Sequence, residues 1–197
     1  MSNNILVNEI KRVFPEIEFE EFIEDGNLDI YFDNDDLEKK YIDRFPMKMD
    51  FRGIHSIYQT FYYIECEDED QQEFKNKMFK VDSYRLTKVV LFILNYSKNI
   101  IMRTNYYDLL KIKDENANIK FYSNTLEYLL RVDDFTDMDK LILLAFKDII
   151  KIDFYLLDLG ITLSLTSDLS CILYTKDNKF DSIIEKISNV EGFYFYK

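Results

Sequence analysis

The stretch KIDFYLLDLGITLSLTSDLSCILYT, residues 151–175, decides the fold of this chain. Apolar and polar side chains alternate over 161–165, which is the period of a β-strand with one buried face. The turn-forming sequence Asp158-Leu159-Gly160 separates that strand from the apolar run 152–157, and a third β-prone run follows at 169–175. Because connections this short join antiparallel neighbours, these runs predict a three-stranded antiparallel meander.

The residues after the meander predict a helix and a closing strand. Apolar side chains recur there at helical spacing, at Phe180, Ile183, Ile184 and Ile187. After Gly192 the ending Phe-Tyr-Phe-Tyr suits a last strand. We therefore expect a C-terminal β-β-β-α-β unit, a half-exposed antiparallel sheet with the helix at 179–189 on one face. The strand over 161–165 is expected to turn Ile161, Leu163 and Leu165 toward that helix.

The part of the chain before this unit predicts further helices and two β segments. A helix is expected at 4–14, ended by Pro15, and an acidic hairpin around Asp25-Gly26 at 17–33. A short helix is expected near 35–43 and a strand at 54–66, although a helical face fits 54–66 as well. Longer helices are expected to be capped by Ser83 and by Asp137, and shorter ones to lie at 106–112 and 124–132. The predicted fold class is α+β, with several helices packed on an antiparallel sheet.

Composition indicates a folded protein that needs no disulfide or metal to close its core. The chain has 197 residues, of which 47% are apolar. Its longest uncharged stretch, 53–64, is too short to span a bilayer, and its start resembles no secretory signal. Cys66 and Cys171 imply no disulfide framework. We expect a soluble, cytoplasmic protein with a single domain over 1–197, or with two sub-lobes at 1–82 and 83–197.

The negative charge is concentrated in the first part of the chain. The formal net charge is −12; residues 1–82 hold 21 acidic and 10 basic side chains, or −11, which leaves −1 for 83–197. Such a surface repels phosphate backbones and attracts basic partners, so we expect a basic protein partner and no direct nucleic-acid binding. The plainer alternative is that these side chains only keep the protein soluble. The predicted partner-binding residues are Glu65, Glu67, Asp68, Glu69, Asp70 and Glu73, together with Asp33, Asp35 and Asp36.

No pattern of catalytic or metal-binding residues stands out. The four glycines are too far apart to form a phosphate-binding loop, and the single histidine, His55, excludes a multi-histidine metal centre. No nucleophile motif surrounds His55 or Cys66. The acidic spacing from Asp25 to Asp36 resembles a calcium loop but has Ile30 where the loop needs glycine. We therefore predict no enzymatic activity and no catalytic, cofactor or metal site.

Small size, acidity and 32 Tyr and Phe residues instead favour a protein that acts by binding. The leading hypothesis is a non-catalytic inhibitor of a basic, nucleic-acid-handling protein. It would be a toxin immunity protein or a phage-type anti-defence inhibitor with an acidic face that mimics nucleic acid. The alternative is a small metal-dependent enzyme that uses Asp and Glu ligands in the acidic N-terminal half. A scaffold subunit is a third interpretation.

Overall fold

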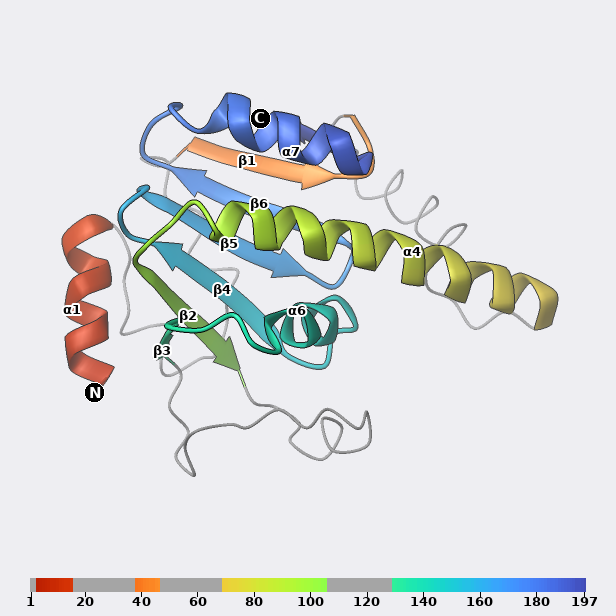
Figure 1. The fold of residues 1–197 in the computed structure, drawn as a ribbon, viewed down its shortest axis with the longest axis horizontal. Helices are drawn as coiled ribbons and strands as arrows, with labels where there is room; N and C mark the ends of the chain where they lie inside the picture. The colour runs from red at the N-terminus through yellow and green to blue at the C-terminus, as the bar shows by residue number, and fades with distance from the viewer. Residues whose placement is uncertain (1–2, 16–37, 47–68, 106–128) are drawn as a thin grey trace.

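A computed structural model describes residues 3–15, 38–46, 69–105 and 129–197. Within these residues a seven-stranded antiparallel sheet packs against helices, which confirms the α+β class (Figure 1). The helices are α1 (Asn3–Val13), α4 (Glu69–Leu94), α6 (Met138–Phe146) and α7 (Asp181–Glu191). The strands are β1 (Glu38–Asp43), β2 (Ile100–Asn105), β3 (Leu129–Arg131), β4 (Lys151–Leu156), β5 (Ile161–Thr166), β6 (Ser170–Thr175) and β7 (Tyr194–Tyr196). The segments predicted at 17–33, 54–66 and 106–112 lie outside the described residues.

The sheet confirms the predicted C-terminal unit and extends it. Its strand order is β3-β2-β4-β5-β6-β1-β7, in which β4, β5 and β6 are the predicted meander and β7 is the predicted closing strand. Strand β1 lies between β6 and β7, far from both in sequence. The described parts of both predicted sub-lobes therefore share one sheet.

Two predicted helices are strands instead. Residues 38–43 form β1 rather than part of a helix at 35–43, because backbone ladders to β6 on one side and β7 on the other outweigh the local helical preference of Glu and Lys. Residues 129–131, expected within a helix at 124–132, form the short edge strand β3, which pairs with β2. In both cases the partner strands come from elsewhere in the sequence.

The predicted helix starts are right at two places and wrong at a third. Helix α1 occupies the predicted segment and ends before Pro15, and α6 begins directly after Asp137. Asp137 makes no side-chain cap hydrogen bond, and its carboxylate pairs with Lys140 instead. Ser83 is not a cap at all, because α4 begins at Glu69 and the Ser83 hydroxyl donates to the carbonyl of Lys80 within the helix.

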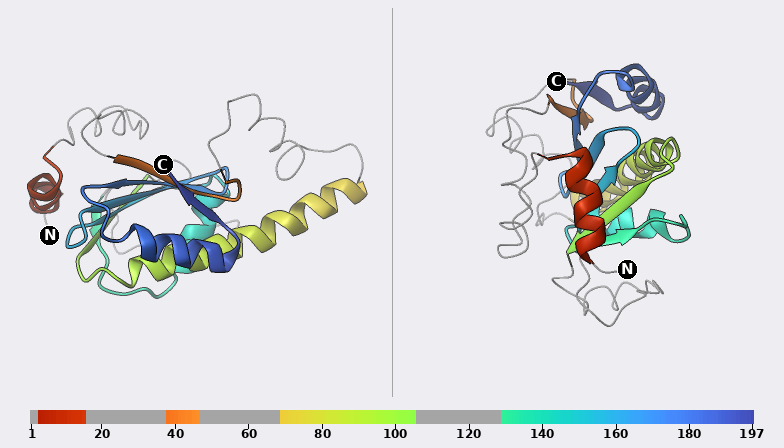
Figure 2. Two further views of the ribbon diagram at one scale, coloured as in Figure 1. Left: turned by 90° about the horizontal axis from the view of Figure 1, so that it is seen from above. Right: turned by 90° about the vertical axis from the view of Figure 1, so that its left-hand side faces the viewer.

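Helices α4, α6 and α7 cover one face of the sheet (Figure 2). Leu86, Val90 and Ile93 of α4 share a buried cluster with Leu163 of β5 and Ile184 of α7. As expected, Ile161, Leu163 and Leu165 all belong to this helix-side cluster. These side chains pack against more than one helix. Ile161 lies beside α7, and β5 also contacts α6.

The opposite face of the central strands is buried, so the expectation of a half-exposed sheet is wrong there. Thr162 is 1% exposed, Ser164 6% and Asp153 1%. Asp153 lies directly across from Arg103 on β2, with 3.6 Å between the carboxylate Oδ2 and the guanidinium Nη1. Helix α1 packs on this side of the sheet against Tyr155. Polar residues at alternate positions therefore do not mark a solvent-facing surface in this sheet.

A buried lysine joins β1 to the start of α7. The Lys40 ammonium is inaccessible to solvent and donates to Thr175 Oγ1 at 2.6 Å, to Asn178 Oδ1 at 2.7 Å and to Asp181 Oδ1 at 2.7 Å. Asp181 is the first residue of α7, where a negative charge is favourable at the positive end of the helix dipole. One side chain thus connects β1, the end of β6 and α7.

Replacing Leu163 by alanine should lower the free energy of unfolding by about 2 to 5 kcal/mol, since the side chain is fully buried in the helix-side cluster. Chemical denaturation measures the change. Val190→Ala is the control, because Val190 is 84% exposed and should change stability by about 0.5 kcal/mol or less. A loss at Leu163 as small as the control's would place this row outside the core.

Replacing Lys40 by methionine should destabilise the protein by about 2 to 4 kcal/mol, because the Asp181 carboxylate loses its buried cation. This is less than the loss of about 3 to 5 kcal/mol expected for a fully buried pair, because the Asp181 side chain is 20% exposed. Lys39→Met is the matched control. Among the described residues Lys39 lies over the rings of Tyr41 and Tyr174, so its replacement should cost about 1 kcal/mol or less. Equal losses for the two variants would refute the role given to Lys40.

Candidate functional site

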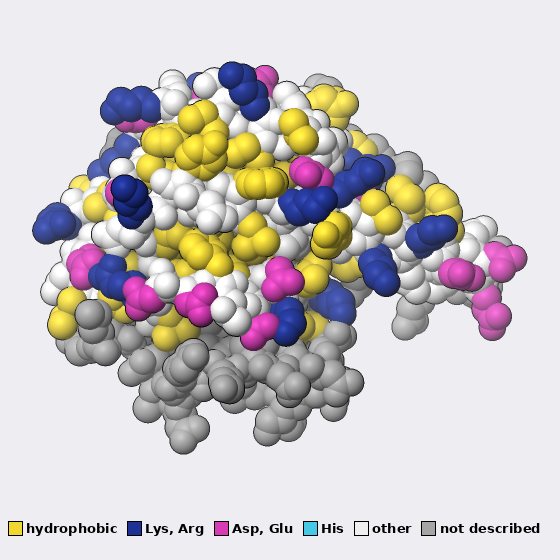
Figure 3. Space-filling view, viewed as in Figure 1, with side chains coloured by type: hydrophobic (Ala, Val, Ile, Leu, Met, Phe, Trp, Pro, Cys, Tyr) yellow, Lys and Arg dark blue, Asp and Glu magenta, His cyan; other side chains and the backbone are white. Residues whose placement is uncertain are grey.

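The acidic end of α4 is the first element of the candidate site. Glu69, Asp70 and Glu73 are exposed in the first two turns, at the end of α4 that projects beyond the sheet (Figures 1 and 3). Acidic side chains here are favoured by the helix dipole, so Glu69 and Asp70 stabilise the first turn of α4. The prediction of an exposed loop or helix start is confirmed for residues 69–73. The other predicted partner-binding residues, Glu65, Glu67, Asp68, Asp33, Asp35 and Asp36, lie outside the described residues.

Large apolar side chains are exposed along the same helix. Among the described residues, eight large apolar side chains are exposed, and five of them lie on α4 or just after it: Phe74, Val81, Tyr84, Phe92 and Tyr96. Phe74 is 57% exposed and Tyr84 58% exposed. Single exposed apolar residues are ordinary, but a series along one helix indicates an interaction surface.

Basic side chains follow the acidic end, so α4 is electrically polarised. Residues 69–73 carry −3, whereas residues 75–88 hold five basic side chains and Asp82, or +4. Asp82 is buried and paired with Arg44, and Lys75 is buried too, so the basic surface consists of Lys77, Lys80, Arg85 and Lys88. The sequence interpretation missed this polarity because it placed the helix start at Ser83 and counted the net charge separately for residues 1–82 and 83–197. A helical projection of 69–94 as one element would have shown it.

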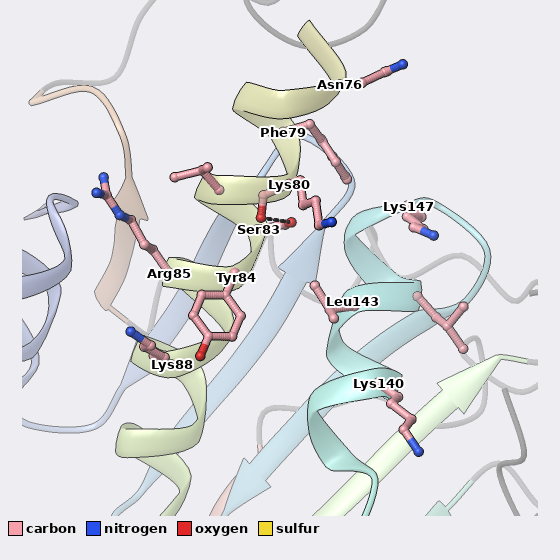
Figure 4. Close-up of a pocket in the computed structure, with 12 residues that line it drawn as sticks. Asn76, Phe79, Lys80, Ser83, Tyr84, Arg85, Lys88, Lys140, Leu143 and Lys147 are labelled. Carbon is pink, nitrogen blue, oxygen red and sulfur yellow. Dashed lines mark hydrogen bonds between the residues drawn. The ribbon is translucent and has the colours of Figure 1, made fainter. Parts of the chain in front are cut away.

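A cavity of about 910 Å³ lies between α4 and α6 (Figure 4). Phe79 of α4 and Leu143 and Leu144 of α6 give it an apolar lining, and no carboxylate is among its described lining residues. Lys88 lies 4.8 Å from the centre of the Tyr84 ring. The basic lining residues are Lys80, Arg85 and Lys88 from α4 and Lys140 and Lys147 from α6.

The chemistry of this cavity is that of a site for an anionic group attached to an apolar body. Its volume lies within the range of about 300 to 1,000 Å³ typical of ligand sites. Lys88 and Lys140 have carboxylate partners, Glu191 at 3.7 Å and Asp137 respectively. Lys80 and Arg85 make no ion pair with any described residue and are exposed. These two cations are the ones available to an incoming carboxylate.

Elsewhere in the described residues, burial raises the pKa values of titratable groups, among them Cys171 and Asp43. Burial raises the pKa of the Cys171 thiol well above its usual range, with smaller contributions from Asp168 and Asp43, so the thiol stays protonated at neutral pH. Burial, aided by the charge of Asp168, also raises the pKa of Asp43. No group of three or more His, Cys, Asp or Glu side chains among the described residues could hold a metal ion. His55 and Cys66 lie outside that part of the chain.

In the part of the chain that the structure describes, no helix is both long enough and apolar enough to cross a membrane. Comparison of the chain with protein-family models, with curated proteins and with solved structures finds no match. The functional interpretation therefore depends on the surfaces described above.

Asp43→Asn should raise the melting temperature at pH 7. The raised pKa means that the folded state holds the Asp43 proton more tightly than the unfolded chain, so ionisation costs stability as pH rises past the folded pKa. Asparagine removes this cost and can still accept the hydrogen bond from the backbone N–H of Phe45. The gain should shrink as pH falls toward about 4, where Asp43 is protonated in wild type as well.

Asp177→Asn is the control with the opposite sign. A hydrogen bond from Lys179 lowers the pKa of Asp177, so its carboxylate contributes stability at neutral pH that is lost as pH falls through the folded pKa. This variant should not gain stability at pH 7. Thermal melts between pH 4 and 8 test both variants. A lower melting temperature for Asp43→Asn at pH 7 would contradict the pKa direction.

Proposed function

We propose that this chain is a non-catalytic binding protein that inhibits a basic, nucleic-acid-handling protein by occupying its basic surface. The observation that carries the proposal is the projecting end of α4, where the exposed carboxylates Glu69, Asp70 and Glu73 precede the exposed ring of Phe74 within two helical turns. Carboxylates guide a basic partner to this end of the helix, and the aromatic ring supplies apolar contact once the two proteins meet.

The arrangement of charge on α4 supports inhibition by mimicry of an anionic ligand. Three carboxylates within two helical turns present a dense negative charge on a projecting helix, as a phosphate backbone does to a basic groove. The proposed setting is the cytoplasm, where such a protein would act as a toxin immunity protein or as a phage-type anti-defence inhibitor.

A competing hypothesis is a metal-dependent enzyme with Asp and Glu ligands in the acidic N-terminal half. Melting the protein with and without Mg²⁺, Mn²⁺ or Ca²⁺ separates the two functions, because an ion that binds only the native state must raise the melting temperature. A binding protein of the proposed kind should melt at the same temperature with each ion.

Neutralising the acidic end by Glu69→Gln, Asp70→Asn and Glu73→Gln together should slow association with the partner. The partner is first identified by pull-down, and association rates are then measured at low and high salt. Steering acts mainly on the association rate and weakens as the Debye length shortens to about 8 Å at physiological ionic strength. The wild-type rate should fall steeply with salt, and the variant's rate should be slower and less salt-dependent.

The control removes the same charge elsewhere, with Asp133→Asn, Asp139→Asn and Glu185→Gln, three exposed residues outside α4. Its association rate and salt dependence should stay close to those of wild type. A second readout is the partner's own nucleic-acid binding, which the wild-type protein should block. Equal rates and equal salt slopes for wild type and the α4 variant would show that these carboxylates only maintain solubility.

A further inference from the structure

The outer side of α4 carries a repeat that the core of the protein does not use. Six residues follow one another at alternating steps of four and three, which is the spacing of the contact positions of a coiled coil. We call them the α4 seam: Asp70, Phe74, Lys77, Val81, Tyr84 and Lys88. Five of the six are exposed and Lys88 is half-buried, whereas the buried residues of α4 lie on the other side of the helix.

The order of the seam residues suits an antiparallel partner with the same sequence. If two α4 helices cross antiparallel at the level of residue 79, Phe74 meets Tyr84 and Lys77 meets Val81. Asp70 meets Lys88, which would share its charge between Asp70 of the second copy and Glu191 of its own chain at 3.7 Å. Every one of these contacts occurs twice, once on each side of the crossing. A parallel pair would instead place Asp70 against Asp70 and Lys88 against Lys88, which is repulsive.

The charge along the two helices runs in opposite senses in this register. Glu73 of one helix comes to the level of Arg85 of the other, on the opposite flank of the seam, so these two charges attract at longer range and do not pair directly. The acidic end of each helix thus meets the basic stretch of its partner. Phe74 arrives beside Tyr84 and Val81, which are among the residues that line the cavity between α4 and α6.

The described residues leave room for this pairing. The N-terminal turns of α4 project beyond the sheet (Figure 1), so two antiparallel copies place each projecting end over the other's body. Figure 3 shows the acidic end at the tip of the projection, with apolar and basic side chains nearer the body. The seam from 70 to 88 is about 27 Å long, which makes a small interface and a weak dimer.

We infer that α4 pairs antiparallel with α4 of a second copy of this chain, about a two-fold axis near residue 79. Such an interface is isologous, since the same surface serves both partners. The pairing does not depend on the proposed inhibitory function. The pairing nevertheless affects the proposed inhibition, because the dimer covers the acidic end of α4. A basic partner would have to displace the second copy.

Sedimentation velocity over a range of concentrations tests the dimer with two charge-reversed variants. The acid-reversed variant carries Glu69→Lys, Asp70→Lys and Glu73→Lys, and the base-reversed variant carries Lys80→Glu, Arg85→Glu and Lys88→Glu. In each variant alone, like charges meet on both sides of the crossing, so the dimer dissociation constant should rise by about tenfold or more. In an equal mixture both sides become attractive again, and a heterodimer should form.

The control reverses an exposed pair on α7, Glu185→Lys with Lys186→Glu, which should dimerise as wild type does. A second variant set, Phe74→Ala with Tyr84→Ala, weakens the apolar contacts without changing charge and should also favour the monomer. Circular dichroism melts establish that each variant is folded. The proposal is overturned if wild type stays monomeric at every concentration, or if the two reversed variants fail to associate when mixed. No partner protein is present in this assay, so its failure leaves the proposed inhibitory function to the association-rate test.

Discussion

Helix α4 is longer than the strands on which it packs, so its N-terminal turns extend past the sheet and are exposed to binding partners. A helix of 26 residues is about 39 Å long, whereas a strand of six residues spans about 20 Å. Apart from Lys75, the buried residues of α4 begin at Asp82, so the earlier turns have little of the core to pack against. The exposed aromatic residues and the charges of these turns follow from that mismatch, since no strand of the described sheet lies under them (Figure 1).

Those parts of the fold whose partners are close in sequence could be predicted, as the meander shows. The alternation of apolar and polar side chains over 161–165 and the short turns on either side predict antiparallel pairing of β4, β5 and β6. The structure contains this pairing. Strand β1 could not be predicted in this way. Its sequence Glu-Lys-Lys-Tyr-Ile-Asp has too few apolar residues for a central strand, and its position depends on Lys40 reaching partners more than 130 residues away. A buried polar network of this kind leaves no periodic signal.

The candidate site was predicted in part. For its described residues, 69–73, the acidic run was correctly placed on the surface, because carboxylates so close together in sequence cannot be buried without matching cations. The basic and aromatic half of the surface was missed. Lys80, Tyr84 and Lys88 lie on one face only if the helix continues through Ser83, and serine is a common cap that suggested a boundary there. The cavity beside α6 joins residues from two helices, which spacing along the sequence does not show.

The central claim is that the projecting turns of α4 form the surface through which this protein binds others, whether a basic partner or a second copy. Amide hydrogen–deuterium exchange tests it most directly, because it reports residues 69–81 and 82–94 separately in one experiment. In dilute protein, 69–81 should exchange faster than 82–94, whose side chains are packed in the core. Raising the protein concentration or adding the partner should slow exchange over 69–81 by a larger factor than over 82–94, where the core already protects the amides. Exchange over 69–81 that stays the same under both conditions would contradict the account.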